Sequence, residues 1–204
     1  MRLSRSEFEA GAQRWLEGRA SPDGRHVQSK WTWRSDPIIA YGYLEQLGKP
    51  ISYPACIDND AGLQRDVVEE CDEAAQDSRL ALDRAFVDYY VVYSPSYQVP
   101  VLYFRGRDRG SQLKLELLLH SALFGRSSRE YPLNTLNEAV DGSGHMPAVS
   151  QGEHPVSGLP CYFLHPCETS AALQDILGPA QAVPPHKLME TWMMLVGSVV
   201  NVER

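Results

Sequence analysis

The strongest constraint on the fold is a pair of apolar runs separated by three turn-forming residues. The runs read FVDYYVVY (86–93) and YQVPVLYFRG (97–106), and Ser-Pro-Ser (94–96) lies between them. Branched and aromatic residues favour strands, and Pro with Ser favours a reversal of the chain. The pattern predicts an antiparallel hairpin. Pro100 has no backbone donor, so we expect it at an edge or a bulge of the second strand.

Helical and strand periods alternate on either side of this hairpin. Residues 4–18 predict an amphipathic helix, in which Ser4 and Glu7 have the spacing of a capping box. We expect further strands at 26–33, 40–47, 148–151 and 161–165, and further helices at 111–124, 170–177 and 187–200. This order predicts an α+β domain in which helices pack on one face of a meandering antiparallel sheet.

Acidic charge is concentrated in one segment of the chain. Residues 57–83 hold nine acidic and two basic side chains, a sum of −7 that equals the formal net charge of the whole chain. A nucleic-acid partner requires a clustered basic surface, so the charge argues against one. We expect a single domain over residues 1–204 with an acidic insertion at about 49–83. The insertion is either solvated or, from the apolar spacing at 63–85, helical.

The chain has the features of a cytoplasmic protein. Its N-terminal residues include acidic side chains and no apolar run, and no later stretch is long and apolar enough to cross a bilayer. Its four cysteines, Cys56, Cys71, Cys161 and Cys167, are better explained as free thiols than as a disulfide framework.

Cys167 has the position of a reactive thiol. It follows the expected strand 161–165 and precedes a helix that Thr169 or Ser170 would cap. Unpaired amides at a helix start favour the thiolate, which is the nucleophilic form, although Glu168 opposes this effect. We therefore take Cys167 as the candidate nucleophile.

Several other roles for Cys167 stay open on the sequence alone. It could be a small buried apolar residue, or it could form a disulfide with Cys161. It could bind zinc with Cys161 and His165, although the spacing C-x3-H-x-C matches no zinc finger or knuckle. It could also be a protease nucleophile, whose base would be one of His120, His145, His154, His165 and His186.

Three blocks of sequence resemble the autophagy-related ubiquitin-like-conjugating enzymes. This family comprises autophagy-related protein ten and its relative, autophagy-related protein three. The blocks are YQVPVLYFRG (97–106), EHPVSGLPCYFLHPCET (153–169) and WMMLVGSVV (192–200). The resemblance implies a ubiquitin-conjugating-enzyme-like core, and the short length of the chain favours the branch of protein ten.

The resemblance also implies a reaction and its partners. Cys167 would accept the ubiquitin-like modifier autophagy-related protein twelve as a thioester from the activating enzyme, autophagy-related protein seven. It would then transfer the modifier to a lysine of autophagy-related protein five. This exchange requires no metal and no diffusible cofactor. It implies a cytoplasmic protein without membrane insertion, recruited to sites where autophagosomes form.

The residues that assist Cys167 follow less directly from the resemblance. Conventional ubiquitin-conjugating enzymes place an asparagine after a His-Pro pair, where its amide stabilises the oxyanion. This chain has Val156 after His154 and Pro155. The resemblance therefore implies that other side chains take this part, and the candidates are Ser150, Tyr97, Tyr103 and His165.

The acidic segment suggests an alternative function. A protein of the same fold could be a non-catalytic adaptor that binds a basic partner through residues 57–83. The missing asparagine after Pro155 and the local charge of −7 both motivate this alternative.

Overall fold

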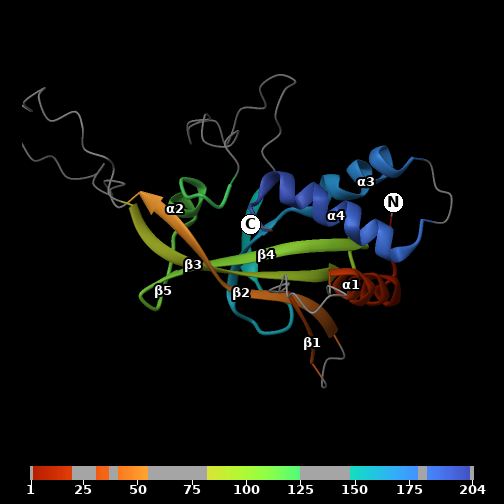
Figure 1. The fold of residues 1–204 in the computed structure, drawn as a ribbon, viewed down its shortest axis with the longest axis horizontal. Coiled ribbons are helices and arrows are strands. Elements are labelled where there is room, and N and C mark those ends of the chain that lie inside the picture. The colour runs from red at the N-terminus through yellow and green to blue at the C-terminus, as the bar shows by residue number, and fades with distance from the viewer. Residues whose placement is uncertain are drawn as a thin grey trace, which may run out of the picture.

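The computed structural model describes residues 2–19, 31–36, 41–54, 82–124, 148–178 and 183–202 (Figure 1). The elements in chain order are α1 (Arg5–Arg19), β1 (Thr32–Asp36), β2 (Tyr41–Pro54), β3 (Leu82–Ser94), β4 (Val99–Asp108), β5 (Ser111–Gln112), α2 (Leu115–Leu119), β6 (Val149–Glu153), β7 (Pro160–Leu164), the 3₁₀ helix η4 (Pro166–Glu168), α3 (Thr169–Leu177) and α4 (Pro185–Val199). None of the helices within these ranges has the length and apolar character needed to span a membrane.

The strands form one antiparallel sheet. Its seven strands include the path β1-β2-β3-β4-β7-β6, and β5 pairs with the end of β4. The expected hairpin is confirmed as β3 and β4, with Tyr93 opposite Pro100. Strand β7 is in register with β4 only at Tyr103 and Phe104. Pro100 therefore lies on a part of β4 beyond the register with β7, which agrees with the expectation of an edge position.

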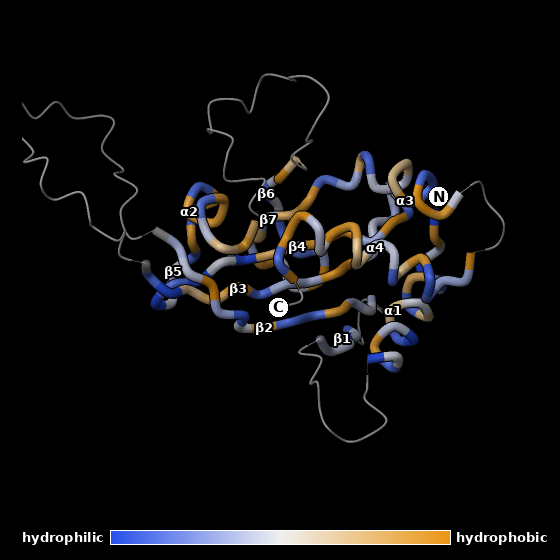
Figure 2. The backbone as a smooth tube through the Cα atoms, turned by 45° about the horizontal axis from the view of Figure 1, so that its top comes forward, coloured by the Kyte–Doolittle hydropathy of each residue, from blue (hydrophilic) through white to orange (hydrophobic). Residues whose placement is uncertain are grey.

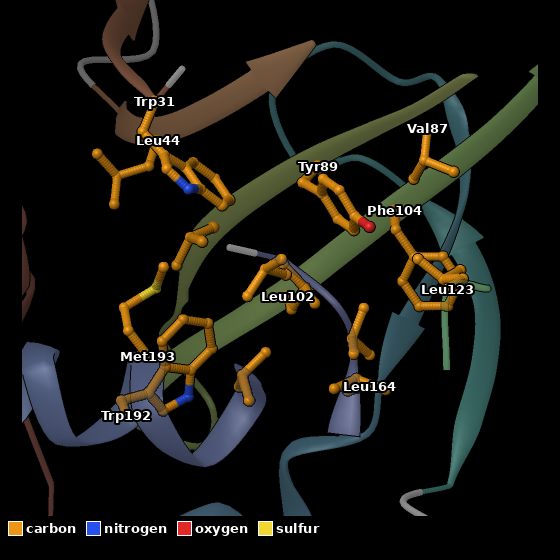
Figure 3. Packing of buried hydrophobic residues seen from close by; sticks show 14 of the residues in the cluster. Trp31, Leu44, Val87, Tyr89, Leu102, Phe104, Leu123, Leu164, Trp192 and Met193 are labelled. Carbon is orange, nitrogen blue, oxygen red and sulfur yellow. The ribbon is translucent and has the colours of Figure 1, made fainter. Parts of the chain in front are cut away.

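The helices cover one face of this sheet. The main core joins Phe8 of α1 and Trp192 of α4 to the strand residues Tyr89, Leu102 and Phe104, all at most 1% exposed. Figure 3 shows part of this core, with Trp192 and the three strand residues labelled. Figure 2 shows apolar residues gathered in α4 and in the neighbouring strand β4. Each large apolar side chain buried in this way contributes about 1.5–3 kcal/mol to folding. The arrangement confirms the predicted α+β class with helices on one face.

The N-terminal capping box is also confirmed. The backbone N–H of Ser4 donates to Glu7 Oε2 at 2.7 Å, and the N–H of Glu7 donates to Ser4 Oγ at 3.3 Å. Each side chain therefore satisfies an amide that the first turn of α1 leaves unpaired. Helix α1 then buries Phe8, Ala12 and Trp15 on one face, as the sequence predicts.

The end of α4 is tied to the sheet by polar contacts. Lys49 Nζ donates to the backbone oxygen of Asn201, and the Tyr89 hydroxyl donates to the same oxygen at 3.2 Å. The N–H of Asn201 donates to the oxygen of Leu123 at 2.7 Å, and Val200 forms a β-bridge with Phe124. These contacts fix the position of α4 over the strands.

The predicted helix over 111–124 is wrong for most of its length. Arg109 and Gly110 have φ angles of 47° and 88°, which turn the chain back so that β5 pairs with β4. Only α2 is helical. The Ser121 hydroxyl then donates to the oxygen of Leu118 and accepts from the N–H of Leu123. Local bonds of this kind compete with helix continuation.

The bounds of the expected acidic insertion also change. Strand β2 continues to Pro54, which pairs with Leu82 at the start of β3, so residues 49–54 and 82–83 belong to the sheet. The helix expected over 63–85 is wrong for residues 82–85, because their backbone pairs with β2. Residues 55–81 lie outside the described residues, and so do Cys56 and Cys71. The strand expected at 26–33 is confirmed for Thr32 and Trp33, the first residues of β1, and residues 26–30 lie outside the described residues.

A buried histidine organises the turn between β6 and β7 on the other face of the sheet. His154 is 1% exposed, and its Nδ1 accepts from the N–H groups of Val156 and Ser157 at 3.2 and 3.1 Å. Its ring lies 4.9 and 4.7 Å from the rings of Tyr43 and Tyr90. Burial lowers the pKa of His154 from 6.5 to about 4. The turn therefore depends on a neutral imidazole.

This environment predicts an acid-dependent loss of stability. The pKa of His154 is about 4 in the folded chain and near 6.5 in the unfolded chain, so its contribution is complete above pH 6.5. We expect the free energy of unfolding to fall as the pH is lowered from about 7 to about 4.5, because the unfolded chain then binds the extra proton. Urea titrations across this range measure the slope.

The matched variants are His154→Gln and His186→Gln, since His186 is exposed on α4. We expect His154→Gln to be about 1–3 kcal/mol less stable at neutral pH, because it disturbs the two amides of the turn. It should also flatten the acid slope. An unchanged slope in His154→Gln would contradict this role.

Candidate active site

Cys167 lies in a single 3₁₀ turn between the last strand and α3. Its thiol is free and exposed, whereas the preceding Pro166 is buried. Proline at the first position of a helical turn has the required φ and leaves no amide unpaired. Because Pro166 anchors the turn, Cys167 is held at the surface beyond the end of β7. The alternative of a buried Cys167 is therefore wrong.

His165 caps this turn through its side chain. Its Nδ1 accepts from the backbone N–H of Cys167 at 3.3 Å. The expected cap at Thr169 or Ser170 is wrong, because α3 continues directly from η4 and its N-cap residue, Glu168, makes no side-chain capping bond. The helical turn starts earlier than predicted, at Pro166. The amide of the candidate nucleophile is thus occupied by an imidazole.

Tyr97 contacts the other side of the same imidazole. The turn between β3 and β4 places the Tyr97 hydroxyl 3.4 Å from His165 Nε2, with the ring centroids 5.5 Å apart in an edge arrangement. Since Nδ1 accepts from Cys167, the neutral ring carries its proton on Nε2 and donates it to Tyr97. The hydroxyl proton of Tyr97, which is 40% exposed, remains available for another acceptor.

Tyr103 and Ser150 lie farther along the same sheet face. The Tyr103 ring is 5.2 Å from Phe163, and Phe163 is 6.4 Å from His165, so one aromatic ring separates Tyr103 from the capping histidine. Burial raises the pKa of Tyr103. Ser150 is opposite Phe163 in the pairing of β6 with β7. In the described part of the chain, neither side chain makes a hydrogen bond that reaches Cys167 or His165.

The second described cysteine has a different environment. Cys161 is fully buried with Tyr90 and Val92, and burial raises the pKa of its thiol to about 11. It is a free thiol, and it stays inside the sheet while Cys167 has left it. The disulfide alternative is therefore wrong. The described residues contain no group of three or more His, Cys, Asp or Glu side chains placed to hold a metal ion.

Among the described residues, the other histidines do not contact Cys167 as a protease base would. His154 is buried in the tyrosine cluster described above, and His120 and His186 are exposed at the end of α2 and at the start of α4. His145 lies outside the described residues. The histidine that does bond to Cys167 accepts from its backbone amide and not from its sulfur.

Cys167 is among the residues that line an open groove of about 620 Å³. Its walls come from β4, α3 and α4, and its lining is mostly apolar. Leu195 and Val199 of α4 contribute to it. The apolar stripe of α4 predicts core packing, and this is confirmed for Trp192 and Val196, which are 1% and 6% exposed. Half-burial cannot be read from a sequence, so the groove was not predicted. The available signal was Leu195, an apolar residue of α4 outside the stripe formed by Met189, Trp192, Met193, Val196 and Val199.

Comparisons with known proteins identify the family of the chain. Residues 7–204 match the family described as "Autophagocytosis associated protein, active-site domain". The human protein named ubiquitin-like-conjugating enzyme ATG10 is 26% identical over 202 residues, which cover 87% of this chain and 81% of the relative.

Relatives of the same name occur in two other organisms. The protein of Dictyostelium discoideum is 30% identical over 122 residues, covering 55% of this chain and 49% of the relative. The protein of Arabidopsis thaliana is 28% identical over 122 residues, covering 57% and 49%. These two alignments span about half of the relatives' own length. The match over residues 7–204 nevertheless includes nearly the whole chain and the junction at Cys167, and the chain belongs to the family of autophagocytosis-associated active-site domains, among the ubiquitin-like-conjugating enzymes of the ATG10 type.

Proposed function

We propose that Cys167 is the residue on which this ubiquitin-like-conjugating enzyme carries its modifier. The observation that supports this most directly is the exposed free thiol, held beyond the end of β7 by Pro166 and the His165 cap. Cys161, the other thiol in the described residues, is sealed inside the sheet. A carrier thiol must be reached by two large partners in turn, and Cys167 has the required exposure.

The proposed partners follow from the family. The modifier is autophagy-related protein twelve, the donor is the activating enzyme autophagy-related protein seven, and the acceptor is a lysine of autophagy-related protein five. The protein would act in the cytoplasm and be recruited to sites where autophagosomes form.

In the first step, the thiolate of Cys167 attacks the carbonyl carbon of the thioester on the activating enzyme. A new carbon–sulfur bond forms, and the thiolate of the activating enzyme leaves. One thioester replaces another, so the exchange is close to balanced in energy. Exposure of Cys167 at the start of α3 suits this step, since the amide ends of a helix favour nearby negative charge.

In the second step, the amine of the acceptor lysine attacks the same carbonyl carbon. An amide bond forms, the Cys167 thiolate leaves, and the amine loses a proton to solvent or to a nearby base. Negative charge develops on the carbonyl oxygen during the attack. Tyr97 is the side chain best placed to donate to this oxygen, because its hydroxyl already accepts from His165 and keeps its own proton free.

A cysteine-to-serine variant tests the carrier role. With activating enzyme, modifier and ATP, we expect the wild-type chain to form an adduct that a reducing agent cleaves. Cys167→Ser should form a reductant-resistant oxyester or no adduct, because a hydroxyl oxygen replaces the thiolate sulfur as the acceptor. Electrophoresis with and without reductant shows the difference. Cys161→Ala is the matched control and should still form the cleavable adduct; a cleavable adduct in Cys167→Ser would refute the assignment.

A second pair of variants tests the donor role of Tyr97. Tyr97→Phe removes the hydroxyl and keeps the ring against His165, so we expect discharge of a preformed adduct to lysine to slow by about 10- to 100-fold. Tyr103→Phe, which removes a hydroxyl from the far side of Phe163, should change the rate by less than about threefold. Single-turnover discharge measures both rates. Equal rates in the two variants would remove Tyr97 from the mechanism.

A third pair tests the cap. His165→Ala leaves the amide of Cys167 without its acceptor, and we expect slower thioester formation by roughly 5- to 20-fold, since a lost cap costs about 1–2 kcal/mol. Asparagine caps helical turns well, so His165→Asn should recover much of the rate of formation. The amide resonance of Cys167 in NMR spectra reports directly whether the cap is restored. If alanine and asparagine behave alike, His165 does not act through the backbone.

A further inference from the structure

The turn that carries Tyr97 has an unusual backbone. Gln98, the last residue before β4, has a φ angle of 57°, in the left-handed region that a residue with a side chain rarely adopts. Two bonds close the turn from within: the N–H of Gln98 donates to the oxygen of Ser94 at 2.7 Å, and the N–H of Tyr97 donates to Ser94 Oγ at 3.4 Å. A strained conformation of this kind persists only where the surrounding structure holds it.

The segment before α1 supplies a contact from outside the turn. The N–H of Leu3 donates to the oxygen of Gln98 at 2.8 Å, and the oxygen of Leu3 accepts from the Tyr93 hydroxyl at 2.7 Å. Leu3 and Tyr93 are 5% and 8% exposed, so water competes little for either bond. Because Tyr93 precedes Ser94 and Gln98 ends the turn, one residue of the N-terminal segment is bonded to both ends of the turn.

Helix α1 in turn fixes the position of Leu3. The capping box at Ser4 begins the helix directly after Leu3. The Phe8 ring stacks on the Tyr93 ring with 5.9 Å between the centroids, and the Arg5 guanidinium lies 5.3 Å from the centroid of the same tyrosine ring. Figure 1 shows α1 at the end of the sheet where β3 turns into β4. The contact of Leu3 with the turn is therefore held by a packed helix.

The backbone of the turn largely decides where the Tyr97 hydroxyl lies. The side chain of Tyr97 is 40% exposed, and its hydroxyl is already 3.4 Å from His165 Nε2, close to the limit of a hydrogen bond. A further displacement of the turn would break this contact. Misplacing a group at a reaction centre by about 1 Å can slow the reaction by about 100-fold.

We infer that the backbone N–H of Leu3, by holding Gln98 in its left-handed conformation, positions the Tyr97 hydroxyl for the transfer of the modifier from Cys167. The inference rests on the proposed function, in which Tyr97 donates to the carbonyl oxygen. Leu3 and Gln98 are positioning residues, because they act through the turn and do not touch the reacting atoms. Loss of the bond between them should therefore slow discharge to lysine more than it slows thioester formation.

The test compares Leu3→Pro with Leu3→Ala in the full chain. Both substitutions shorten the side chain, but only Leu3→Pro removes the backbone N–H that donates to Gln98. Each variant is loaded with the modifier as a thioester on Cys167, and discharge to lysine is followed in single turnovers. We expect Leu3→Pro to discharge about 5- to 20-fold more slowly than Leu3→Ala, with less than about a threefold difference in the rate of thioester formation.

A Tyr97→Phe background separates positioning from a general loss of structure. If Leu3 acts through the Tyr97 hydroxyl, its substitutions lose their effect once that hydroxyl is gone. We therefore expect less than about a twofold difference in discharge between Leu3→Pro and Leu3→Ala in this background.

A second pair of variants decides where Leu3→Pro does not fold, as circular dichroism would show. Tyr93→Phe removes the donor to the Leu3 oxygen and keeps the ring that stacks on Phe8. Tyr89→Phe is the matched control, because it removes a hydroxyl donor to a backbone oxygen from the same face of β3, four residues farther from the turn. We expect slower discharge in Tyr93→Phe than in Tyr89→Phe, by about 3- to 10-fold.

The possible failures can be told apart. Equal discharge within a pair of variants, or an equal loss with and without the Tyr97 hydroxyl, would overturn the inference and leave the proposed roles of Cys167 and Tyr97 in place. If Tyr97→Phe alone discharges at the wild-type rate, the donor role of Tyr97 fails and the inference falls with it. If wild type forms no cleavable adduct on Cys167, the carrier role itself fails.

Discussion

The position of the candidate active site depends on the short pairing of β7 with β4. This pairing is in register at only two positions, and it joins β6 and β7 to the rest of the sheet. A shift of one residue would exchange the faces of the β7 side chains. Tyr162 and Leu164 would then leave the main core, and His165 would no longer meet Tyr97. Core packing of Tyr162 and Leu164 therefore specifies the register, and the register places the residues around Cys167.

Cys161 in β7 and Cys167 in the turn after it have opposite chemical environments. Cys161 lies inside the sheet, in contact with Tyr90 and Val92, where burial disfavours its thiolate. Cys167 lies beyond Pro166, where the chain has changed from strand to helical turn. The difference in exposure between the two thiols follows from the path of the backbone. Strand β7 ends at Leu164, and the buried Pro166 then starts a helical turn that leaves Cys167 at the surface.

Those parts of the fold that depend on local sequence could be predicted. The β3–β4 hairpin, α1 with its capping box, and α4 with its apolar stripe each follow from periodicity and turn chemistry within the segment. The helix expected over 111–124 was wrong because the turn at Arg109 and Gly110 lets β5 pair with β4, a partner that the local pattern does not contain. Tertiary pairing there outweighs the helical propensity of the leucine-rich stretch.

In the candidate active site too, local features could be predicted and contacts between distant segments could not. The junction at Cys167 is visible in the sequence, because a proline, a cysteine and a helix start are neighbours in the chain. The contact of Tyr97 with His165 joins residues separated by 68 positions, and the strand period could not distinguish Tyr97 from Tyr103. Tyr97 lies just before β4, and Tyr103 lies within it. The arrangement of the strands in the sheet decides which of the two tyrosines contacts His165.

An accessible sulfur in the lining of an apolar groove also has a pharmacological consequence. A mild electrophile by itself would react with exposed thiols of many proteins. The same electrophile joined to a hydrophobic group with a terminal amine would match the leucine and valine side chains of the groove and the carboxylates of Glu168 and Asp175. Selectivity would then come from the attached group.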